Sequence, residues 1–304
     1  MSSLKPIQIQ GITDVGCVRA GNEDCFLIQP LGRGVASLNA DHLYELGESE
    51  ALFVAVSDGM GGAAAGELAS QTGLETLGAY VQDHSEALTV GEPRQIMTIL
   101  ERGVREANAA ILEKAREIRT RRGMGATITA LFLKRDVIYL LQVGDSRAYV
   151  LRDGKLVRIT RDQSFVGHLV EMGTITEAQA MKHPQRSVIL QALGTQEVVK
   201  TDLSYLELCK DDVILLCSDG LYSEFLPEDL EERVLPAAKL PLSDGVHALV
   251  EEAKNAGGKD NITVIGIKVH DNAPERAPGE EPGYQPFPFL DRDNPLEKVQ
   301  SLFQ

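Results

Sequence analysis

No run of apolar residues in this 304-residue sequence approaches the roughly 20 residues that a membrane-spanning helix needs. The first ten residues, MSSLKPIQIQ, also lack the apolar core of a secretory signal peptide. These two absences predict a protein with no membrane span, and we expect a cytoplasmic location.

Cysteine is scarce, and the few cysteines form no pattern. The four residues, Cys17, Cys25, Cys209 and Cys217, lie singly along the chain without a C-x-x-C pair. Cys25 and Cys217 fall inside apolar runs that we expect to be strands. Isolated cysteines of this kind predict reduced thiols in the core, which agrees with a cytoplasmic protein.

Basic residues are in the minority. The chain has 30 Lys and Arg against 45 Asp and Glu, which gives a formal net charge of −15. That balance argues against a nucleic-acid backbone or an anionic membrane as the main partner. With 43% hydrophobic residues the chain can bury a sizeable core, in one large domain or two.

Apolar runs and turn signals predict a mixed fold of antiparallel strands and helices. Hairpin-sized links, such as Arg152-Asp153-Gly154-Lys155, indicate antiparallel pairing of the strands on either side. Helical periodicity and composition predict helices at 63–81, 93–120, 227–234 and 246–255. The expected strands are 7–13, 25–28, 52–56, 126–133, 137–143, 148–151, 156–159, 203–208, 213–217 and 262–269. Helices in two groups around such strands favour two packed sheets covered by helices.

Acidic residues recur where the apolar strands meet turns. The run 53–56, for example, is followed by Ser57-Asp58-Gly59. The five aspartates placed in this way are Asp24, Asp58, Asp145, Asp219 and Asp260. One such motif alone is also typical of a capped strand-to-helix turn. Five converging carboxylates would repel one another, however, unless divalent cations with oxygen ligands supplied the missing charge.

Six motifs, in order and at suitable spacing, resemble the metal-dependent Ser/Thr protein phosphatases, the PPM or type 2C family, in their bacterial form. The motifs are RAGNEDCF, VAVSDGMGG, MGAT, VGDSRAYV, LLCSDGL and GGKDNITV. The resemblance covers roughly residues 7–270 and implies one phosphatase domain over residues 1–270. It also implies an α+β fold, an αββα sandwich of two antiparallel sheets flanked by helices, with a helical flap at about 161–194.

The resemblance implies metal-dependent hydrolysis of phosphoserine and phosphothreonine in proteins, with a water that bridges two metal ions as the nucleophile. The ions would be Mn²⁺ or Mg²⁺, and the partners would be phosphoproteins and a Ser/Thr kinase that the enzyme opposes. The metal residues implied are Asp58 as bridging ligand, Gly59 through its carbonyl, Asp219 and Asp260 at the second ion, and Asp24 holding metal-bound waters. Arg19 matches the arginine that binds phosphate.

A third, weaker ion is implied at Asp145, for which the alternative is an Asp that caps a turn. Two departures from the family pattern bear on the chemistry. Ala63 stands where bacterial members often have a His, so the leaving alkoxide would need its proton from water. Ser223 stands where some members carry an acidic residue, which would weaken the third site. The flap histidines, His168 and His183, are not expected to be ligands.

Three other functions stay open at this point. A non-catalytic binder of the same fold is disfavoured because the main metal-site aspartates are all present. A narrow regulator that dephosphorylates one anti-sigma-factor antagonist is disfavoured by the flap and the RxxNxD motif. A metal-dependent nuclease or phosphodiesterase is disfavoured by the acidic charge. The sequence also has no Cys-x5-Arg loop, so cysteine-based phosphatase chemistry is not expected.

The composition changes after residue 270. Six of the 13 prolines fall in residues 271–304, which predicts a disordered or extended acidic tail with a short amphipathic helix at 296–303. The alternative is a segment that docks a protein partner. Its exposed apolar anchors would then be Phe287, Phe289, Leu290 and Phe303.

Overall fold

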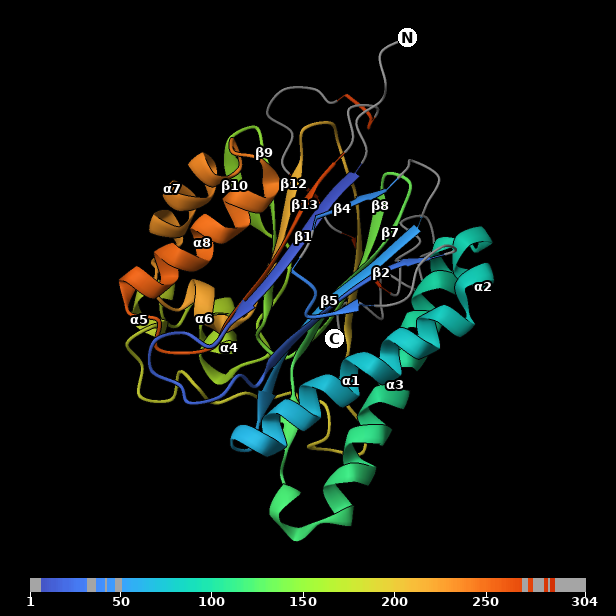
Figure 1. Cartoon of the computed structure of the whole chain (residues 1–304), viewed down its shortest axis with the longest axis vertical. Helices are drawn as coiled ribbons and strands as arrows, with labels where there is room; N and C mark the ends of the chain where they lie inside the picture. Colours follow the sequence, from blue (N-terminus) through green and yellow to red (C-terminus); the bar gives the residue numbers. More distant parts are fainter. Residues whose placement is uncertain are drawn as a thin grey trace.

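Two antiparallel β-sheets lie face to face at the centre of the protein, and helices cover the outer face of each sheet (Figure 1). The computed structural model describes residues 7–31, 37–41, 43–46, 51–269, 273–275, 282–283 and 285–287. This layered order confirms the predicted α+β fold, an αββα sandwich.

The first sheet has six strands, in the order β10-β9-β12-β13-β1-β4. Their bounds are β1 (Ile7–Asp14), β4 (Tyr44–Leu46), β9 (Arg147–Arg152), β10 (Lys155–Arg158), β12 (Val213–Cys217) and β13 (Ile262–Lys268). Every neighbouring pair in this sheet is antiparallel, and for β9 and β10 the short link between them predicted this.

The second sheet has the order β14-β11-β8-β7-β5-β2-β3, and a short strand, β6, pairs with β5 beside it. Its strands are β2 (Asp24–Leu31), β3 (Ser37–Leu38), β5 (Ala51–Met60), β6 (Gly125–Ala126), β7 (Ile128–Lys134), β8 (Val137–Val143), β11 (Asp202–Glu207) and β14 (Gln285–Pro286). The single strand predicted at 126–133 is therefore two, separated by Thr127, and β5 runs on past the predicted end at residue 56.

The core between the sheets consists of fully buried side chains from both inner faces. Phe26 and Val54 of the second sheet pack in one cluster with Ile214 and Ile267 of the first. The outer faces are buried by the helices as well, so the central strands are apolar on both sides. This explains why the strand at 52–56 appears in the sequence as a continuous apolar run rather than an alternation.

Two groups of helices cover the sheets. Helices α1 (Ala63–Asp83) and α3 (Pro93–Glu117) pack together on the second sheet, with α2 (Ser85–Val90) between them in sequence. Helices α7 (Pro227–Ala237) and α8 (Leu242–Ala256) cover the first sheet. The apolar face of α3 recurs every three or four residues, as predicted, and is buried against α1 and the sheet.

Residues 161–194 contain two short helices, as expected for a helical flap. These are α4 (Phe165–Glu171) and α5 (Glu177–Ala180). Ser164 caps α4 by accepting a hydrogen bond from the Gly167 N–H, and Thr176 forms a capping box with Gln179 at α5. Local side-chain bonds thus define the two helices within a largely polar segment.

The described part of the tail packs on the core, which corrects the expectation of a solvated tail at these residues. Ala273 is buried between the sheets, and the Lys210 N–H donates to the Pro274 carbonyl. Strand β14 adds to the edge of the second sheet, where the Phe287 N–H donates to the Leu203 carbonyl at 2.8 Å. The Phe287 ring packs against the core and is not an exposed anchor.

The other predicted features of the tail fall outside the described residues. These are Phe289, Leu290, Phe303 and the helix at 296–303. The domain boundary at residue 270 stays a prediction.

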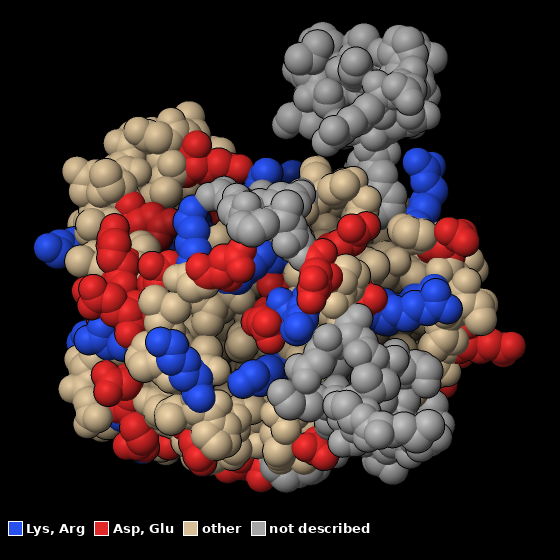
Figure 2. All heavy atoms as spheres, turned by 90° about the horizontal axis from the view of Figure 1, so that it is seen from above, with Lys and Arg blue, Asp and Glu red and all other residues tan. Residues whose placement is uncertain are grey.

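All four cysteines carry free thiols, as predicted, but only Cys25 and Cys217 are buried, whereas Cys17 is exposed. Within the residues that the structure describes, no helix combines the length and hydrophobicity needed to cross a membrane. On the face seen in Figure 2, Asp and Glu side chains are interspersed with Lys and Arg rather than gathered by sign.

Candidate active site

The five predicted aspartates converge at one end of the sandwich, from both sheets. Asp24 and Asp58 lie on β2 and β5, and Asp145 follows β8. Asp219 is the first residue of α6 (Asp219–Tyr222), and Asp260 comes just before β13. Burial, followed by the charges of the other four aspartates, raises the pKa of Asp58 well above its usual range. The carboxyl groups are therefore close enough to repel one another.

The pairing of β2 with β5 sets the centre of this cluster. Asp24 lies directly opposite Asp58 in the ladder, so both side chains project from the same face of the sheet. Thr127 then holds the backbone of Asp58 from the other side. Its N–H donates to the Asp58 carbonyl at 2.8 Å, and its hydroxyl accepts the Asp58 N–H at 3.0 Å. The break between β6 and β7 thus has a structural reason.

Gly59 and Gly220 sit where backbones approach too closely for a side chain. A Cβ on Gly59 would lie 2.1 Å from the carbonyl oxygen of Gly66 at the start of α1. A Cβ on Gly220 would lie 1.9 Å from the carbonyl oxygen of Asn261. The glycine of each DG motif therefore lets a neighbouring segment pack directly beside the aspartate that precedes it.

Asp24 is held by two hydroxyl groups of the protein. Ser218 Oγ and Thr263 Oγ1 donate to Asp24 Oδ2 at 2.6 and 2.7 Å. Burial raises the pKa of Asp24 to about 7, although these two hydrogen bonds act in the opposite direction. Because one oxygen is already bound by the protein, the arrangement suits an indirect role at a metal site better than direct ligation.

Asp219 and Asp145 are also buried carboxyl groups. Burial, followed by the charge of Asp260, raises the pKa of Asp219 to about 6, while the nearby Arg19 acts to lower it. Burial, followed by the charge of Asp219, raises the pKa of Asp145 to about 8. Within the described ranges, no Lys or Arg forms an ion pair with Asp58, Asp145 or Asp219.

Arg19 lies at the rim of the cluster. Its Nη2 is 2.6 Å from Asp260 Oδ2, and about half of the Arg19 side chain is exposed. The charge of Asp260 raises the pKa of Arg19 through this hydrogen bond and ion pair. A guanidinium has five N–H donors, so one pair with Asp260 leaves donors that can reach an incoming anion.

A groove of about 820 Å³ runs from the aspartates toward the flap. Asp145, Asp219 and Asp260 form part of one wall, and residues of α4 and α5 form another. No histidine is among its lining residues in the described part of the chain. The groove is large enough to hold a stretch of polypeptide next to the carboxylate cluster.

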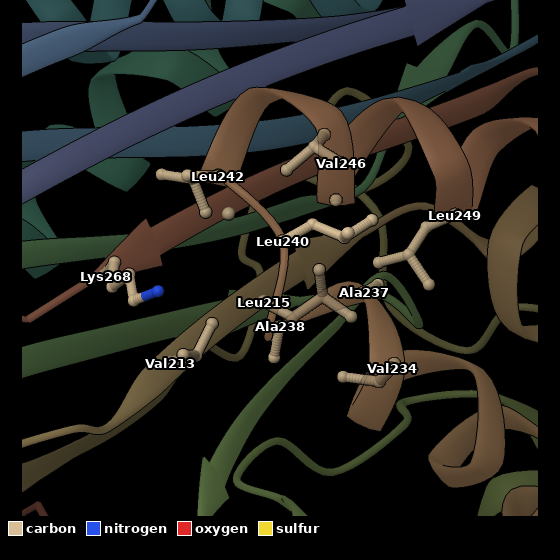
Figure 3. Close-up of a pocket in the computed structure, with 12 residues that line it drawn as sticks. Val213, Leu215, Val234, Ala237, Ala238, Leu240, Leu242, Val246, Leu249 and Lys268 are labelled. Atoms are coloured by element: carbon tan, nitrogen blue, oxygen red, sulfur yellow. The ribbon is translucent and has the colours of Figure 1, made fainter.

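A second pocket is apolar and lies between α7, α8 and the first sheet (Figure 3). Its labelled lining side chains are Val213, Leu215, Val234, Ala237, Ala238, Leu240, Leu242, Val246, Leu249 and Lys268. Among the described residues that line it, Lys268 alone has a titratable side chain, and a single such group does not form a catalytic site.

The family model described as protein phosphatase 2C matches residues 35–254 of this chain. The chain belongs to the protein phosphatase 2C family. This confirms the predicted PPM family.

Relatives within the family are bacterial. The Ser/Thr protein phosphatase PstP of Mycobacterium tuberculosis is 39% identical over 239 residues, which are 78% of this chain and 43% of PstP. The chain thus spans less than half the length of that relative. The Ser/Thr phosphatase stp of Listeria monocytogenes is 35% identical over 215 residues, 71% of this chain and 83% of stp.

Solved structures of PstP share the fold. One structure of the M. tuberculosis enzyme superposes with a TM-score of 0.70 at 35% identity, over 87% of this chain and 99% of that one. A second, of the PstP catalytic domain in complex with two manganese ions, has a TM-score of 0.67 at 33% identity and covers 88% of this chain and 99% of that one.

The protein phosphatase 2C site of this chain fits divalent cations in its chemistry. Its donors are carboxylate oxygens that burial and mutual repulsion make hard to ionise together. As the side chains stand, though, no group of three or more His, Cys, Asp or Glu among the described residues is arranged to hold an ion. Asp24 bonds to hydroxyls and Asp260 to Arg19 instead. The ligand assignments therefore stay predictions.

Several residues of the site were not predicted from the sequence. Ser218 and Thr263 position Asp24. The feature of the sequence that could have identified them is a hydroxyl side chain inside or beside an apolar strand. Tyr222 donates its hydroxyl to the Asp145 carbonyl at 3.0 Å. Arg147 stacks on the Tyr222 ring at 3.7 Å and forms a bidentate pair with a flap residue, Asp162.

Proposed function

We propose that this protein hydrolyses phosphoserine and phosphothreonine in other proteins, with Mn²⁺ or Mg²⁺ as cofactor. The observation that carries the proposal is the cluster around Asp58, whose pKa is raised first by burial and then by four other aspartates, while no Lys or Arg of the described residues forms an ion pair with Asp58. Such a cluster is costly in a folded protein unless cations neutralise it. The manganese-bound PstP relative supports the same cofactor.

Residues of both sheets would hold the cations. Asp58, Asp219 and Asp260 would be carboxylate ligands, Gly59 would offer its carbonyl, and Asp24 would act through its free oxygen on bound water. Asp145 would hold a third ion. When bound, divalent ions neutralise phosphoryl oxygens and lower the pKa of a water that attacks phosphorus.

Arg19 is the group of this chain that would bind the phosphate directly. Its guanidinium is always charged, and half of the side chain faces solvent beside Asp260. Two N–H groups of one guanidinium can bond two phosphate oxygens at once. Arg19 would therefore orient the phosphoryl group over the aspartates while the groove holds the peptide.

The leaving serine or threonine alkoxide needs a proton. The chain has Ala at position 63, and no histidine lines the described groove. Water is therefore the proposed source of that proton, as the sequence predicted. The same reasoning predicts slower turnover of alkyl phosphates than of aryl phosphates, whose leaving groups need the proton less.

The biological setting follows from the proposed reaction. A Ser/Thr kinase would supply the phosphorylated substrates, and the cytoplasm is the proposed location. The net charge of −15 supports protein rather than nucleic-acid substrates. Binding of a protein partner by the tail is proposed only for residues after Phe287, because the described tail residues pack on the core.

The experiment is phosphate release from a phosphothreonine peptide, with Mn²⁺ and with excess chelator. We expect turnover only with the metal, and a loss of most of it in Asp58→Asn. A DNA phosphodiester and an aryl phosphate serve as comparison substrates. Undiminished turnover in chelator, or cleavage of the diester in preference to the peptide, would refute the proposal.

A further inference from the structure

A basic cluster stands at the end of α3, in a protein that is otherwise acidic. Five of the 30 Lys and Arg residues fall within positions 114–122: Lys114, Arg116, Arg119, Arg121 and Arg122. They occupy the last turn of α3, the short helix η1 (Arg119–Arg121) that follows it, and the residue after η1, Arg122. In Figure 1 this segment is at the lower end of the molecule, below the start of α1.

Three of these cations form no ion pair with an acidic residue of the described ranges, and one of the three, Lys114, donates to Thr72 Oγ1 at 3.0 Å instead. Arg116 pairs with Glu197 and Arg121 with Glu117, at 3.2 and 3.3 Å. Arg119 and Arg122 are exposed, and no Asp or Glu of the described ranges forms an ion pair with either. We call the segment Arg119–Arg122 the basic turn. It presents two unpaired guanidinium groups to solvent.

The basic turn is tied to the active site by the backbone that follows it. Met124 is buried, and its Cα would lie 2.9 Å from a Cβ on Gly61, in the turn after Asp58. Gly125 then pairs with Met60 in the β5–β6 ladder. From these links the Cα of Arg122 lies within about 24 Å of the Cα of Asp58.

In the groove beneath the flap, by contrast, most Lys and Arg side chains already form an ion pair with an acidic residue. Arg158 pairs with Glu177, Arg161 with Glu171, and Lys259 with Glu224. Among the described residues, Arg186 also lines the groove without an ion pair, so unpaired cations near the site lie both there and in the basic turn, on the side of α3.

We propose that the basic turn binds an acidic or phosphorylated segment of the substrate protein, at a distance from the phosphoresidue that is hydrolysed. This inference rests on the proposed phosphatase activity. A chain with a net charge of −15 repels acidic substrates, and an unpaired pair of arginines near the site offsets that repulsion locally. Guanidinium groups also match carboxylate and phosphate geometry.

The distance from Arg122 to Asp58 limits how many residues can separate the acidic positions of the peptide from the phosphothreonine. An extended peptide advances about 3.3 Å per residue, so 24 Å corresponds to about seven residues or fewer. The side chain of arginine reaches several ångströms farther toward the peptide. The acidic residues should therefore stand no more than about seven positions from the phosphothreonine.

The test compares two phosphothreonine peptides. One carries Glu at the positions four to seven residues before and after the phosphothreonine, the other carries Gln at these positions, and they are otherwise identical. We expect the wild type to favour the Glu peptide by about fivefold in kcat/KM at low salt, because exposed ion pairs are individually weak. In Arg119→Glu/Arg122→Glu the preference should disappear or reverse. Hydrolysis of an aryl phosphate should stay unchanged.

The matched control is Arg94→Glu/Arg102→Glu, which makes the same charge change at exposed positions of the same helix. Arg102 lies about 22 Å along the axis from the end of α3. The control should keep the wild-type preference for the Glu peptide. Salt at 0.5 M should abolish this preference in the wild type and in the control. Unchanged melting temperatures establish that each variant is folded.

Three results would overturn the inference. The first is an unchanged Glu-to-Gln ratio in the basic-turn variant, and the second is an equal loss in the control. The third is a basic-turn variant that loses binding to DNA or to anionic vesicles while its peptide ratio stays unchanged. If the wild type hydrolyses no phosphopeptide at all, it is the proposed function that fails, which the Mn²⁺ experiment detects separately.

Discussion

Asp24 and Asp58 face each other across the β2–β5 ladder, and both are carboxylates. Like charges directly opposite in an antiparallel pair destabilise a sheet. The pKa of Asp58 is raised by burial first and by Asp24 next. The centre of the site is thus a point where the fold is less stable than it could be, and a bound cation would relieve the destabilisation.

The first prediction follows from this pair. Asp58→Asn should stabilise the metal-free protein by up to about 1 kcal/mol, because it removes a like-charge contact. It should at the same time abolish most phosphatase turnover. Thermal melts in chelator measure the first effect, and phosphate release with Mn²⁺ measures the second. Added Mn²⁺ should raise the melting temperature of the wild type more than that of the variant.

The control for this prediction is Asp153→Asn, an identical chemical change in the exposed β9–β10 turn. Asp153 has a positive φ of 50°, which Asn also tolerates, so the change should alter neither stability nor turnover. A metal-free Asp58→Asn protein that melts below the wild type would contradict the repulsion between Asp24 and Asp58.

The second prediction concerns pH in the absence of metal. In the folded protein the pKa values of Asp219, Asp24 and Asp145 are raised to about 6, 7 and 8, against about 3.9 in the unfolded chain. The folded state therefore binds more protons between these limits, and its stability should fall as pH rises from about 4 to 8. Urea unfolding in chelator at pH 5.5, 7 and 8.5 measures this trend.

Added Mn²⁺ should flatten or reverse this dependence of stability on pH, because the cation binds the deprotonated carboxylates and competes with protons. A metal-free protein whose stability rises steadily from pH 5.5 to 8.5 would show that the three carboxyl groups are not perturbed in this way.

Long elements with a strong pattern were predicted from the sequence, and short ones were not. Strand β12 and the start of α3 agree with prediction to the residue, because a buried apolar run and a 25-residue periodic helix leave little ambiguity. Helix α6 has four residues, too few to show a period. Strand β14 contains Pro286, and proline at a sheet edge resembles a loop in sequence.

The site was predicted to a similar degree. Repetition of an aspartate at the boundary of an apolar strand identified these residues, and the fold brings them together. Their supporting contacts were not predictable, because they join residues far apart in sequence. Ser218 and Thr263, which both bind Asp24, are 194 and 239 residues away from it. Which residues meet at Asp24 depends on how the two sheets pack, and no local sequence pattern encodes that packing.

The third prediction uses the described part of the tail. A chain that ends at residue 269 loses buried Ala273, the hydrogen bond from Lys210 to Pro274, and strand β14. It should be destabilised by about 2–3 kcal/mol. Aryl-phosphate hydrolysis at 20 °C should nevertheless persist, because no tail residue lines the groove among the residues described.

A chain that ends at Phe287 is the matched comparison, because it keeps each of these contacts. Its stability should stay within about 0.5 kcal/mol of the full-length protein. Urea unfolding of both truncations measures the difference. Equal stability of the two would mean that the packing of residues 273–287 contributes nothing to the fold.

The last prediction concerns Asp145. Its carboxyl group is buried and forms no ion pair with a Lys or Arg of the described residues. Asp145→Ala should leave the fold intact and keep Asp58, Asp219 and Asp260 for metal binding. Turnover should fall, because a third ion held by Asp145 would position a water able to protonate the leaving alkoxide, a task that Ala63 cannot perform. Aryl phosphates have good leaving groups and need that proton less.

The loss in Asp145→Ala should therefore be larger for phosphothreonine peptides than for aryl phosphates, by about tenfold or more. Tyr222→Phe is the matched control, because it removes the hydrogen bond to the Asp145 backbone carbonyl and keeps the carboxyl group. If misplacement of the loop were the cause, Tyr222→Phe would reduce turnover of both substrates equally. Equal losses on both substrates in Asp145→Ala would likewise assign Asp145 a positioning role, and no loss on either would remove it from the site.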